Sequence, residues 1–277
     1  MRLMGRPFFT ADWHLDHARI LTYCRRLEFM NEGEKENFLQ TERLYQQGEV
    51  EYDAMRSLRY SHETVDRMNS AIIDGVNEAV GENDDLWIGG DIIFGSIHRL
   101  KDLLDRIVCR NIHIVWGNHD KNLRYAMRPD KFHRSLLERV LSGQISQEFA
   151  LDEWETYETE HADQRLLEEM FKSFQDTAMV RWEGQKIFIT HTAHAVWDGS
   201  HRGIWHCYGH SHGHFEYWRE EHLSNAKMLD VGIDYRAQLG FGYTPWSFEE
   251  LKKVMDGHDG QAVDIIGKKG RNERKRN

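Results

Sequence analysis

Five short apolar segments of this 277-residue chain each end in a cluster of residue types that bind metals. Each segment is rich in Ile, Val, Phe or Trp and stops at polar residues or glycine, which is typical of buried β-strands. The carboxyl ends of strands in an α/β sheet are where sites assemble, so we expect an α/β protein whose strands converge on one polar site. These five strands, and a sixth near residue 230, are predicted at Pro7–Thr10, Leu86–Gly89, Ile112–Trp116, Lys186–Thr190, His206–Tyr208 and Met228–Val231.

The polar clusters follow the five strands in a fixed order. They are Asp12-Trp13-His14, Gly89-Gly90-Asp91, Gly117-Asn118-His119-Asp120, His191 and Gly209-His210-Ser211-His212. Residues two apart in an extended chain project to the same side, so the paired side chains of the first and last clusters can reach one ion. The neighbouring glycines let the backbone turn sharply. Each cluster alone has an ordinary structural explanation, but together they predict a metal site.

This ordered set resembles the calcineurin-like metallophosphoesterase superfamily, whose pattern is D-x-H, G-D, G-N-H-D or G-N-H-E, a lone His, and G-H-x-H. The match runs from Asp12 to His212, and the run from Leu229 to Asp234 looks like the family's closing strand. Asp16 departs from the pattern, because glycine often stands at its place. The resemblance implies a four-layer αββα sandwich, with two mixed sheets flanked by helices. The alternation of strands and helices is compatible with that fold but does not single it out.

The resemblance also implies a pair of divalent transition-metal ions. Nitrogen and oxygen ligands suit such ions, and we expect manganese first, with iron, zinc, nickel and cobalt open. Two ions about 3.5–4 Å apart activate a bridging hydroxide as the nucleophile and clamp the phosphoryl oxygens. By analogy, His119 protonates the leaving oxygen, and Asp120 is placed to hydrogen-bond His119. One ion would be held by Asp12, His14, Asp91 and His212, and the other by Asp91, Asn118, His191 and His210.

We therefore expect a phosphoester hydrolase, and first a phosphodiesterase acting on a small or nucleotide-like substrate. A phosphomonoesterase or phosphoprotein phosphatase, a nuclease, and a non-catalytic metal-binding interaction module remain as alternatives. The net charge of −10 does not favour nucleic acid as a partner, because phosphate contacts need many Lys and Arg side chains. Further candidates for substrate contacts, with surface charge as the equally good explanation for the arginines, are His17, Arg25, Arg26, His194 and Arg202.

Three apolar stripes with three- and four-residue spacing predict helices over 65–80, 97–107 and 166–174, the first with Ser61 as its N-cap. Residues 25–60 and 140–180 carry helix formers but little strand pattern, so we expect two helical insertions able to cover a site. No repeat or proline-rich linker divides the chain, which favours a single domain over 1–277. The last ten residues, 268–277, form a basic tail.

Three cysteines without C-x-x-C spacing argue against a disulfide scaffold or a thiolate zinc site and fit a reducing compartment. The first residues show no apolar stretch of signal-peptide length. No apolar run approaches the roughly 20 residues that span a bilayer. We expect a cytoplasmic protein with no membrane partner.

Overall fold

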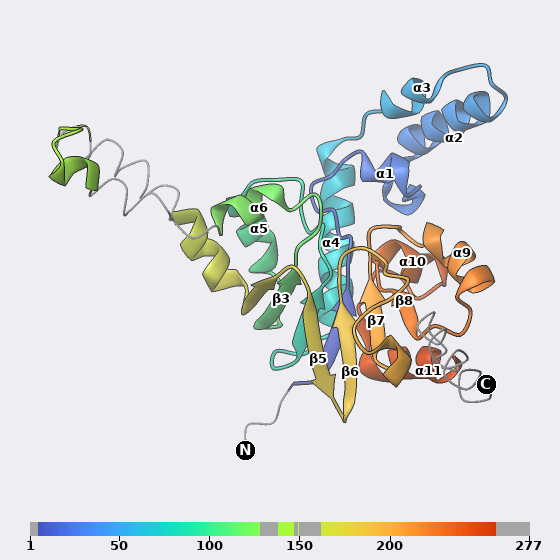
Figure 1. The fold of residues 1–277 in the computed structure, drawn as a ribbon. Coiled ribbons are helices and arrows are strands. Elements are labelled where there is room, and N and C mark those ends of the chain that lie inside the picture. The colour runs from blue at the N-terminus through green and yellow to red at the C-terminus, as the bar shows by residue number, and fades with distance from the viewer. Residues whose placement is uncertain (1–4, 128–137, 147–148, 150–161, 259–277) are drawn as a thin grey trace, which may run out of the picture.

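The computed structural model describes residues 5–127, 138–146, 149 and 162–258, and these form an α/β protein with two mixed sheets flanked by helices (Figure 1). The first sheet has the strand order β4-β3-β2-β1-β9. Its strands β1 to β4 run parallel, and β9 pairs antiparallel with β1 at the edge. The bounds are β1 Pro7–Thr10, β2 Asp85–Ile88, β3 Asn111–Val115, β4 Ser173–Gln175 and β9 Trp246–Ser247.

The second sheet has the strand order β5-β6-β7-β8. Strands β6, β7 and β8 run parallel, and β5 pairs antiparallel with β6. The bounds are β5 Ala178–Trp182, β6 Gln185–Ile189, β7 Trp205–Tyr208 and β8 Met228–Asp230. Both sheets are therefore mixed, as the resemblance implied.

The helices lie outside the sheets and in the connections between strands (Figure 1). Helix α4 begins where expected, because the Ser61 side chain accepts a hydrogen bond from the backbone N–H of Thr64. The helices are α1 Ile20–Tyr23, α2 Glu32–Gln46, α3 Tyr52–Arg56, α4 His62–Ala79, α5 Ile97–Leu104, α6 Lys121–Ala126, α9 His214–His222, α10 Ile233–Gln238 and α11 Phe248–Asp256, with 3-10 turns at η1 Leu27–Phe29 and η2 Ser200–Arg202 and a further helix over 162–170.

The alternation of side chains along each strand separates the apolar core into layers. In β1, Phe8 packs on the side of α4 and α5, whereas Phe9 packs toward the second sheet. In β7, Cys207 faces the first sheet, whereas Tyr208 faces outward and joins a small cluster with Trp197. Because successive strand residues point to opposite faces, this pattern requires two facing sheets with cover on their outer sides.

The two sheets meet at the carboxyl ends of β1 and β8. An isolated parallel bridge pairs Ala11 with Gly232, and the backbone N–H of Ile233 donates to the carbonyl of Ala11. The segment after β1 therefore belongs to both sheets. Polar residues that follow strands of either sheet are brought to this common edge.

All six predicted strands are confirmed to within about one residue at each end. The prediction of a helix over 166–174 was wrong beyond residue 170, because the helix ends there, Phe171 follows it and Phe174 lies in β4. Of the 140–180 segment, residues 147–148 and 150–161 lie outside the described residues. Its described part contains the helix over 162–170 and also β4 and the start of β5, which its helix formers did not predict. Strand β9, of two residues, carries no pattern that its sequence could reveal.

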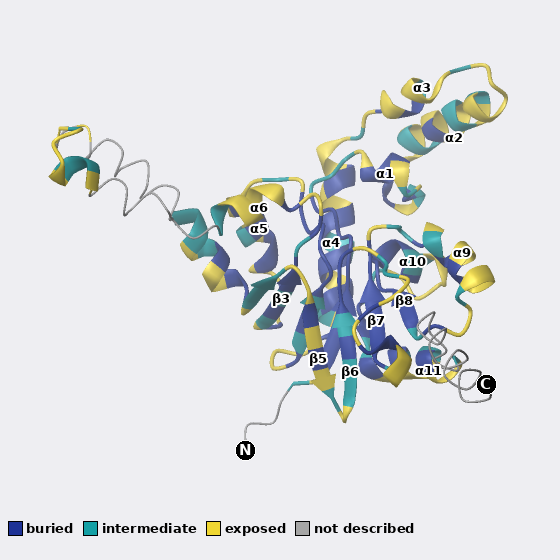
Figure 2. Cartoon of the chain, viewed as in Figure 1, coloured by how far each residue is buried: buried dark blue, intermediate teal, exposed yellow. Residues whose placement is uncertain are grey.

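The segment 25–60, expected to be a helical insertion, contains η1, α2 and α3. Most of the residues of α2 and α3 are exposed or half-buried, in contrast to β7 and β8, which are buried throughout (Figure 2). Phe38 is the buried anchor of α2. Among the described residues, no helix is both long enough and apolar enough to cross a membrane.

Candidate metal centre

The backbone at the expected site is left-handed at five of the predicted metal ligands. Their φ values lie between 49° and 69°, a region that side-chain-bearing residues rarely adopt. This corrects the expectation that pairs two apart converge because the chain is extended. Strained backbone of this kind is retained where the surrounding structure enforces it, and it clusters at functional sites. The five residues are Asp12, His14, Asp91, His210 and His212.

Six of the predicted side chains lie in two groups at the common edge of the sheets. In the first group, ligand atoms of Asp12, His14 and His212 all lie within 4.8 Å of one another. In the second group, ligand atoms of Asp91, His191 and His210 meet the same limit. Each group contains one carboxylate and two imidazoles, a donor set that suits a divalent transition metal.

Asp91 connects the two groups. One of its carboxylate oxygens, Oδ2, is 3.3 Å from Nε2 of His191 and 3.8 Å from Nε2 of His14. Asn118, the seventh predicted ligand, places its amide oxygen 2.9 Å from the same His191 nitrogen. The structure thus brings all seven side chains of the predicted ligand set to one place.

The first group contains buried polar atoms that lack a partner. Asp12 is 0% and His14 is 2% exposed, and neither Oδ1 of Asp12 nor Nε2 of His14 has a hydrogen-bond partner. Burial raises the pKa of Asp12 to about 7 and lowers the pKa of His14 to about 2. An unpaired buried carboxylate oxygen and imidazole nitrogen are costly, and a cation between them would satisfy both. The residues present therefore fit a metal ion.

The second group is held together by its own contacts. His191 donates from Nδ1 to the carbonyl of Gly89 at 2.7 Å, which turns Nε2 toward Asp91. Burial would raise the pKa of Asp91 and lower that of His191. The contact between them outweighs burial, lowering the pKa of Asp91 to about 2 and raising that of His191 to about 9. His210 is the exposed member of the group.

Two glycines allow the carboxylates to come this close to the backbone. A Cβ atom on Gly117 would lie 2.1 Å from Oδ1 of Asp91, and one on Gly209 would lie 2.4 Å from Oδ2 of Asp12. Both distances are far below van der Waals contact, so any side chain at either position would displace a carboxylate. The glycines in G-N-H-D and G-H-S-H are explained by these close approaches.

Arg26 corrects a prediction, because it is a buried support of the site and not a phosphate binder. Its side chain is 1% exposed and forms two bonds to Asp234, from Nε at 2.7 Å and from Nη2 at 2.8 Å. It also donates to the carbonyls of Asp12 and Trp13. A guanidinium so fully occupied has no face to offer a substrate.

Asp234 in turn orients a predicted ligand. Its Oδ2 accepts a hydrogen bond from Nδ1 of His212 at 2.7 Å, which leaves Nε2 of that ring for an ion. Burial would lower the pKa of His212, but the bond to Asp234 outweighs it and raises the pKa to about 12. Sequence reasoning missed this role, although Asp234 stands in the run that resembles the family's closing strand.

Asp120 also has a different role from the expected one. Its carboxylate accepts backbone N–H bonds from Asp91, Ile92 and Gly117, at 2.7 to 3.0 Å. The expected bond to the ring of His119 is not among the interactions of the described residues. Asp120 therefore fixes the loops that carry Asp91 and Asn118, and it does not orient the expected proton donor.

His119 is exposed beside the first group, with its ring centroid 5.7 Å from that of His14. Its backbone N–H donates to Oδ1 of Asp91 at 2.8 Å, which leaves Oδ2 for the ions. His17 lies nearby, with Nδ1 3.2 Å from Nδ1 of His14. Burial, and then the neighbouring His119, lower the pKa of His17 to about 4, so this ring is neutral at pH 7.

The remaining predicted residues lie away from the two groups or are engaged elsewhere. Arg25 is paired with Glu42 of α2 in an exposed ion pair at 2.7 Å. Arg202 is exposed and lies 3.5 Å from Asp198. The backbone N–H of His194 donates to Nε2 of the buried His206 at 3.1 Å. Substrate binding by these three residues stays a prediction.

One soft ligand lies close to the site, which the cysteine pattern did not indicate. Ligand atoms of Cys24, His212 and Asp234 lie within 4.8 Å of one another, and Cys24 directly follows α1. Burial raises the pKa of the Cys24 thiol. A protonated thiol is a weak ligand, so the first group remains the better match for an ion.

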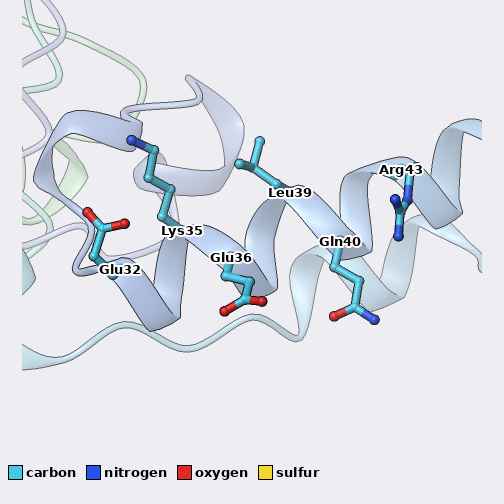
Figure 3. Close-up of a pocket in the computed structure, with 6 residues that line it drawn as sticks. All are labelled: Glu32, Lys35, Glu36, Leu39, Gln40 and Arg43. Carbon is cyan, nitrogen blue, oxygen red and sulfur yellow. The ribbon is translucent and has the colours of Figure 1, made fainter.

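A hollow elsewhere in the molecule contains none of these residues. It runs along α2, where side chains of both charges line it (Figure 3). Its lining consists of Glu32, Lys35, Glu36, Leu39, Gln40 and Arg43. The polar site at the strand ends is therefore separate from this hollow.

No protein-family model matches the chain, and no curated protein matches it. Among solved structures, it is similar to the protein of unknown function AQ665 from Aquifex aeolicus. The two share 13% sequence identity with a TM-score of 0.47, over 90% of this chain and 99% of that one.

Proposed function

We propose that the protein is a two-metal phosphoester hydrolase, and first a phosphodiesterase. The observation that carries the proposal is the pair of adjoining groups joined by Asp91. In the first group, the buried atoms Oδ1 of Asp12 and Nε2 of His14 have no hydrogen-bond partner. Two divalent ions bound there would stabilise charge on the phosphoryl oxygens and acidify a water molecule. Asp12, His14 and His212 would hold one ion, Asn118, His191 and His210 the other, with Asp91 between them.

His119 is the residue best placed to move a proton. It follows Asn118 directly, and its ring is exposed at the edge of the first group. The backbone bond from His119 to Asp91 fixes the start of its side chain relative to the centre. A ring held there can donate a proton to the leaving oxygen of a phosphoester without acting as a ligand.

The supports beneath the ligands keep the site pre-organised. Asp120 holds three backbone N–H groups, and Asp234 holds the ring of His212. Ligands fixed in this way need little rearrangement when an ion binds, which favours affinity and defined geometry. This arrangement supports catalysis over a passive metal-binding module, since nothing in the expected ligand set or in the proton donor is missing.

The test is a metal add-back experiment on protein stripped by a chelator. Mn, Fe, Zn, Ni and Co are added singly, and hydrolysis of bis(4-nitrophenyl) phosphate is compared with that of 4-nitrophenyl phosphate. We expect turnover with at least one metal and a preference for the diester. A tenfold or greater preference for the monoester would make the protein a phosphomonoesterase. No hydrolysis with any metal would favour the interaction module.

Two variants make the result specific to the site. His14→Ala removes a ligand of the first group and should abolish the metal-dependent activity. His222→Ala is the matched control, because that ring is exposed on α9, stacks on Trp218 and touches neither group. Activity that survives His14→Ala would mean that the hydrolysis belongs to a contaminant or to another site.

A further inference from the structure

A row of aromatic rings leads from the candidate metal centre to α1. The ring of Phe94 stacks on that of His17, with centroids 3.7 Å apart and planes 13° apart. Phe94 also lies 4.7 Å from the ring of His119, and His17 lies 6.1 Å from that of Tyr23. We call His119, Phe94, His17 and Tyr23 the aromatic row. It begins at the expected proton donor.

The row offers apolar surface to the solvent beside a polar site. Phe94 is 42% and Tyr23 is 38% exposed, although Ile92 and Ile93 directly before Phe94 are almost fully buried. A solvent-exposed aromatic ring contributes little to folding stability, because the stabilisation comes from burying its apolar area. The run Ile92-Ile93-Phe94 thus exposes the Phe94 ring to solvent at the edge of the site.

Phe94 is held in place by the backbone. Its N–H donates to the carbonyl of Leu15 at 2.8 Å, and a parallel bridge pairs Leu15 with Ile93. Leu15 follows the ligand His14, so the ring is fixed relative to the first group. Because Phe94 is already held in place, a substrate ring that stacked on it would cost little entropy for ordering this residue.

We infer that the aromatic row binds a planar ring carried by the substrate, so that the substrate class is a phosphoester of a nucleoside. This inference rests on the proposed function and deepens it. Bases stack on aromatic side chains whatever their sequence, since every base has a π-face. With the phosphate at the metal centre, the row lies where the group attached to that phosphate would extend.

The first experiment measures binding alone, with manganese-loaded protein. Adenosine 5′-monophosphate and ribose 5-phosphate carry the same phosphate and differ in the base. We expect the wild type to bind the nucleotide at least about fivefold more tightly, and Phe94→Ala to bring the two dissociation constants close together. Phe94→Trp should restore the preference, because it keeps a stacking surface.

The matched control is Trp218→Ala. Trp218 is 45% exposed and stacks on His222 with centroids 4.5 Å apart, so it repeats the exposed aromatic–histidine pair at a distance from the ligands. This variant should keep the wild-type preference for the nucleotide. Manganese content is measured for every variant, since a purely structural role for Phe94 would weaken metal binding and lower both affinities equally.

The second experiment measures turnover of two diesters with one leaving group, thymidine 5′-(4-nitrophenyl) phosphate and methyl 4-nitrophenyl phosphate. We expect Phe94→Ala to lower the nucleoside-to-methyl ratio of kcat/KM, mainly through KM. Equal affinity of the wild type for the two monophosphates, or an unchanged ratio in Phe94→Ala, would overturn the inference. Tighter binding of the nucleotide than of ribose 5-phosphate, without hydrolysis of either diester, would instead refute the proposed function. The inference that the aromatic row binds a base would then still hold.

Discussion

The first and second groups of the candidate metal centre use the same residue types but differ in how they are satisfied without a metal. In the second group, the Asp91 carboxylate and the His191 ring lie 3.3 Å apart and compensate each other's charge. In the first group, Asp12 and His14 are as deeply buried, yet each leaves one polar atom without a partner. In the first group, His212 is oriented by Asp234, which is paired with the buried Arg26.

This difference indicates what each group gains from an ion. A cation in the first group relieves the cost of unpaired buried polar atoms, whereas a cation in the second must first replace the contact between Asp91 and His191. We therefore expect the first group to bind its ion more tightly. The exposed His210 also makes the second group the more accessible of the two.

The substitution Asp91→Asn should weaken metal binding in both groups at once, because Asp91 lies between them. Loss of its charge weakens both, and we expect metal content to fall below one ion per chain. Turnover should fall by at least roughly 10³-fold, since the ions supply several kcal/mol of stabilisation and each 1.36 kcal/mol is a factor of ten. Elemental analysis after gel filtration and the diester assay measure the two effects. His210→Ala, confined to the second group, should leave one ion bound.

The substitution His119→Ala separates chemistry from metal binding. Its ring lies beside the first group but belongs to neither, so both ions should remain. Turnover should fall by roughly 10²-fold or more, which is the contribution of a positioned general acid. A diester with a more acidic leaving group needs less protonation and should lose less. Full turnover with intact metal content would eliminate His119 as the proton donor.

The substitution Asp234→Asn should weaken the first group selectively. Without the carboxylate, the ring of His212 loses its fixed orientation, and we expect the tighter of two manganese affinities to fall about 10- to 100-fold. Calorimetric titration of stripped protein measures both affinities. An equal loss in both would mean that Asp234 acts on the fold and not on His212.

A second variant separates the effect of Asp234→Asn on folding stability from its effect on metal affinity. Arg26 is 1% exposed, and removing its partner leaves a buried charge unpaired, which costs about 3–5 kcal/mol. The double variant Arg26→Met/Asp234→Asn removes that charge as well. It should recover most of the folding stability but not the metal affinity, because the bond to His212 is still lost.

The sequence predicted the part of this centre that depends on local pattern. Strand ends followed by Asp, His and Asn can be recognised along the chain, and the parallel arrangement then brings them to one edge. The two-residue strand β9 and the three-residue β4 were missed because so few residues show no period. The third miss, β5, does alternate, but it lies at the end of a segment dominated by helix formers.

The supports of the site could not be predicted in the same way. Arg26 and Asp234 are 208 residues apart, and nothing near either residue indicates that the two charges are buried together. The adjacency of Asp120 and His119 predicted a hydrogen bond between their side chains. The turn instead directs the Asp120 carboxylate to backbone N–H groups. Long-range pairing and the direction of a side chain within a turn are properties of the folded chain.

The smallest predicted effect concerns His206, a buried histidine outside both groups. Its Nε2 accepts the backbone N–H of His194 at 3.1 Å, and its Nδ1 lies 3.3 Å from the carbonyl of Phe188, so the folded state needs the neutral ring. Burial lowers its pKa to about 3, against an ordinary value near 6.5. Its stabilising contribution is therefore complete above about pH 6.5 and is lost as the pH falls toward 3, because only the unfolded chain takes up the proton.

Between pH 7 and pH 5 this proton uptake should cost the wild type about 2 kcal/mol of unfolding free energy. His206→Gln cannot titrate, so its stability should fall less over that interval, by about the same 2 kcal/mol, even if it is less stable at pH 7. Urea unfolding with a chelator present measures both proteins, and the histidines of the two groups titrate alike in each. Equal losses in the two proteins would mean that His206 keeps an ordinary pKa, and the acid sensitivity would then belong to the metal centre.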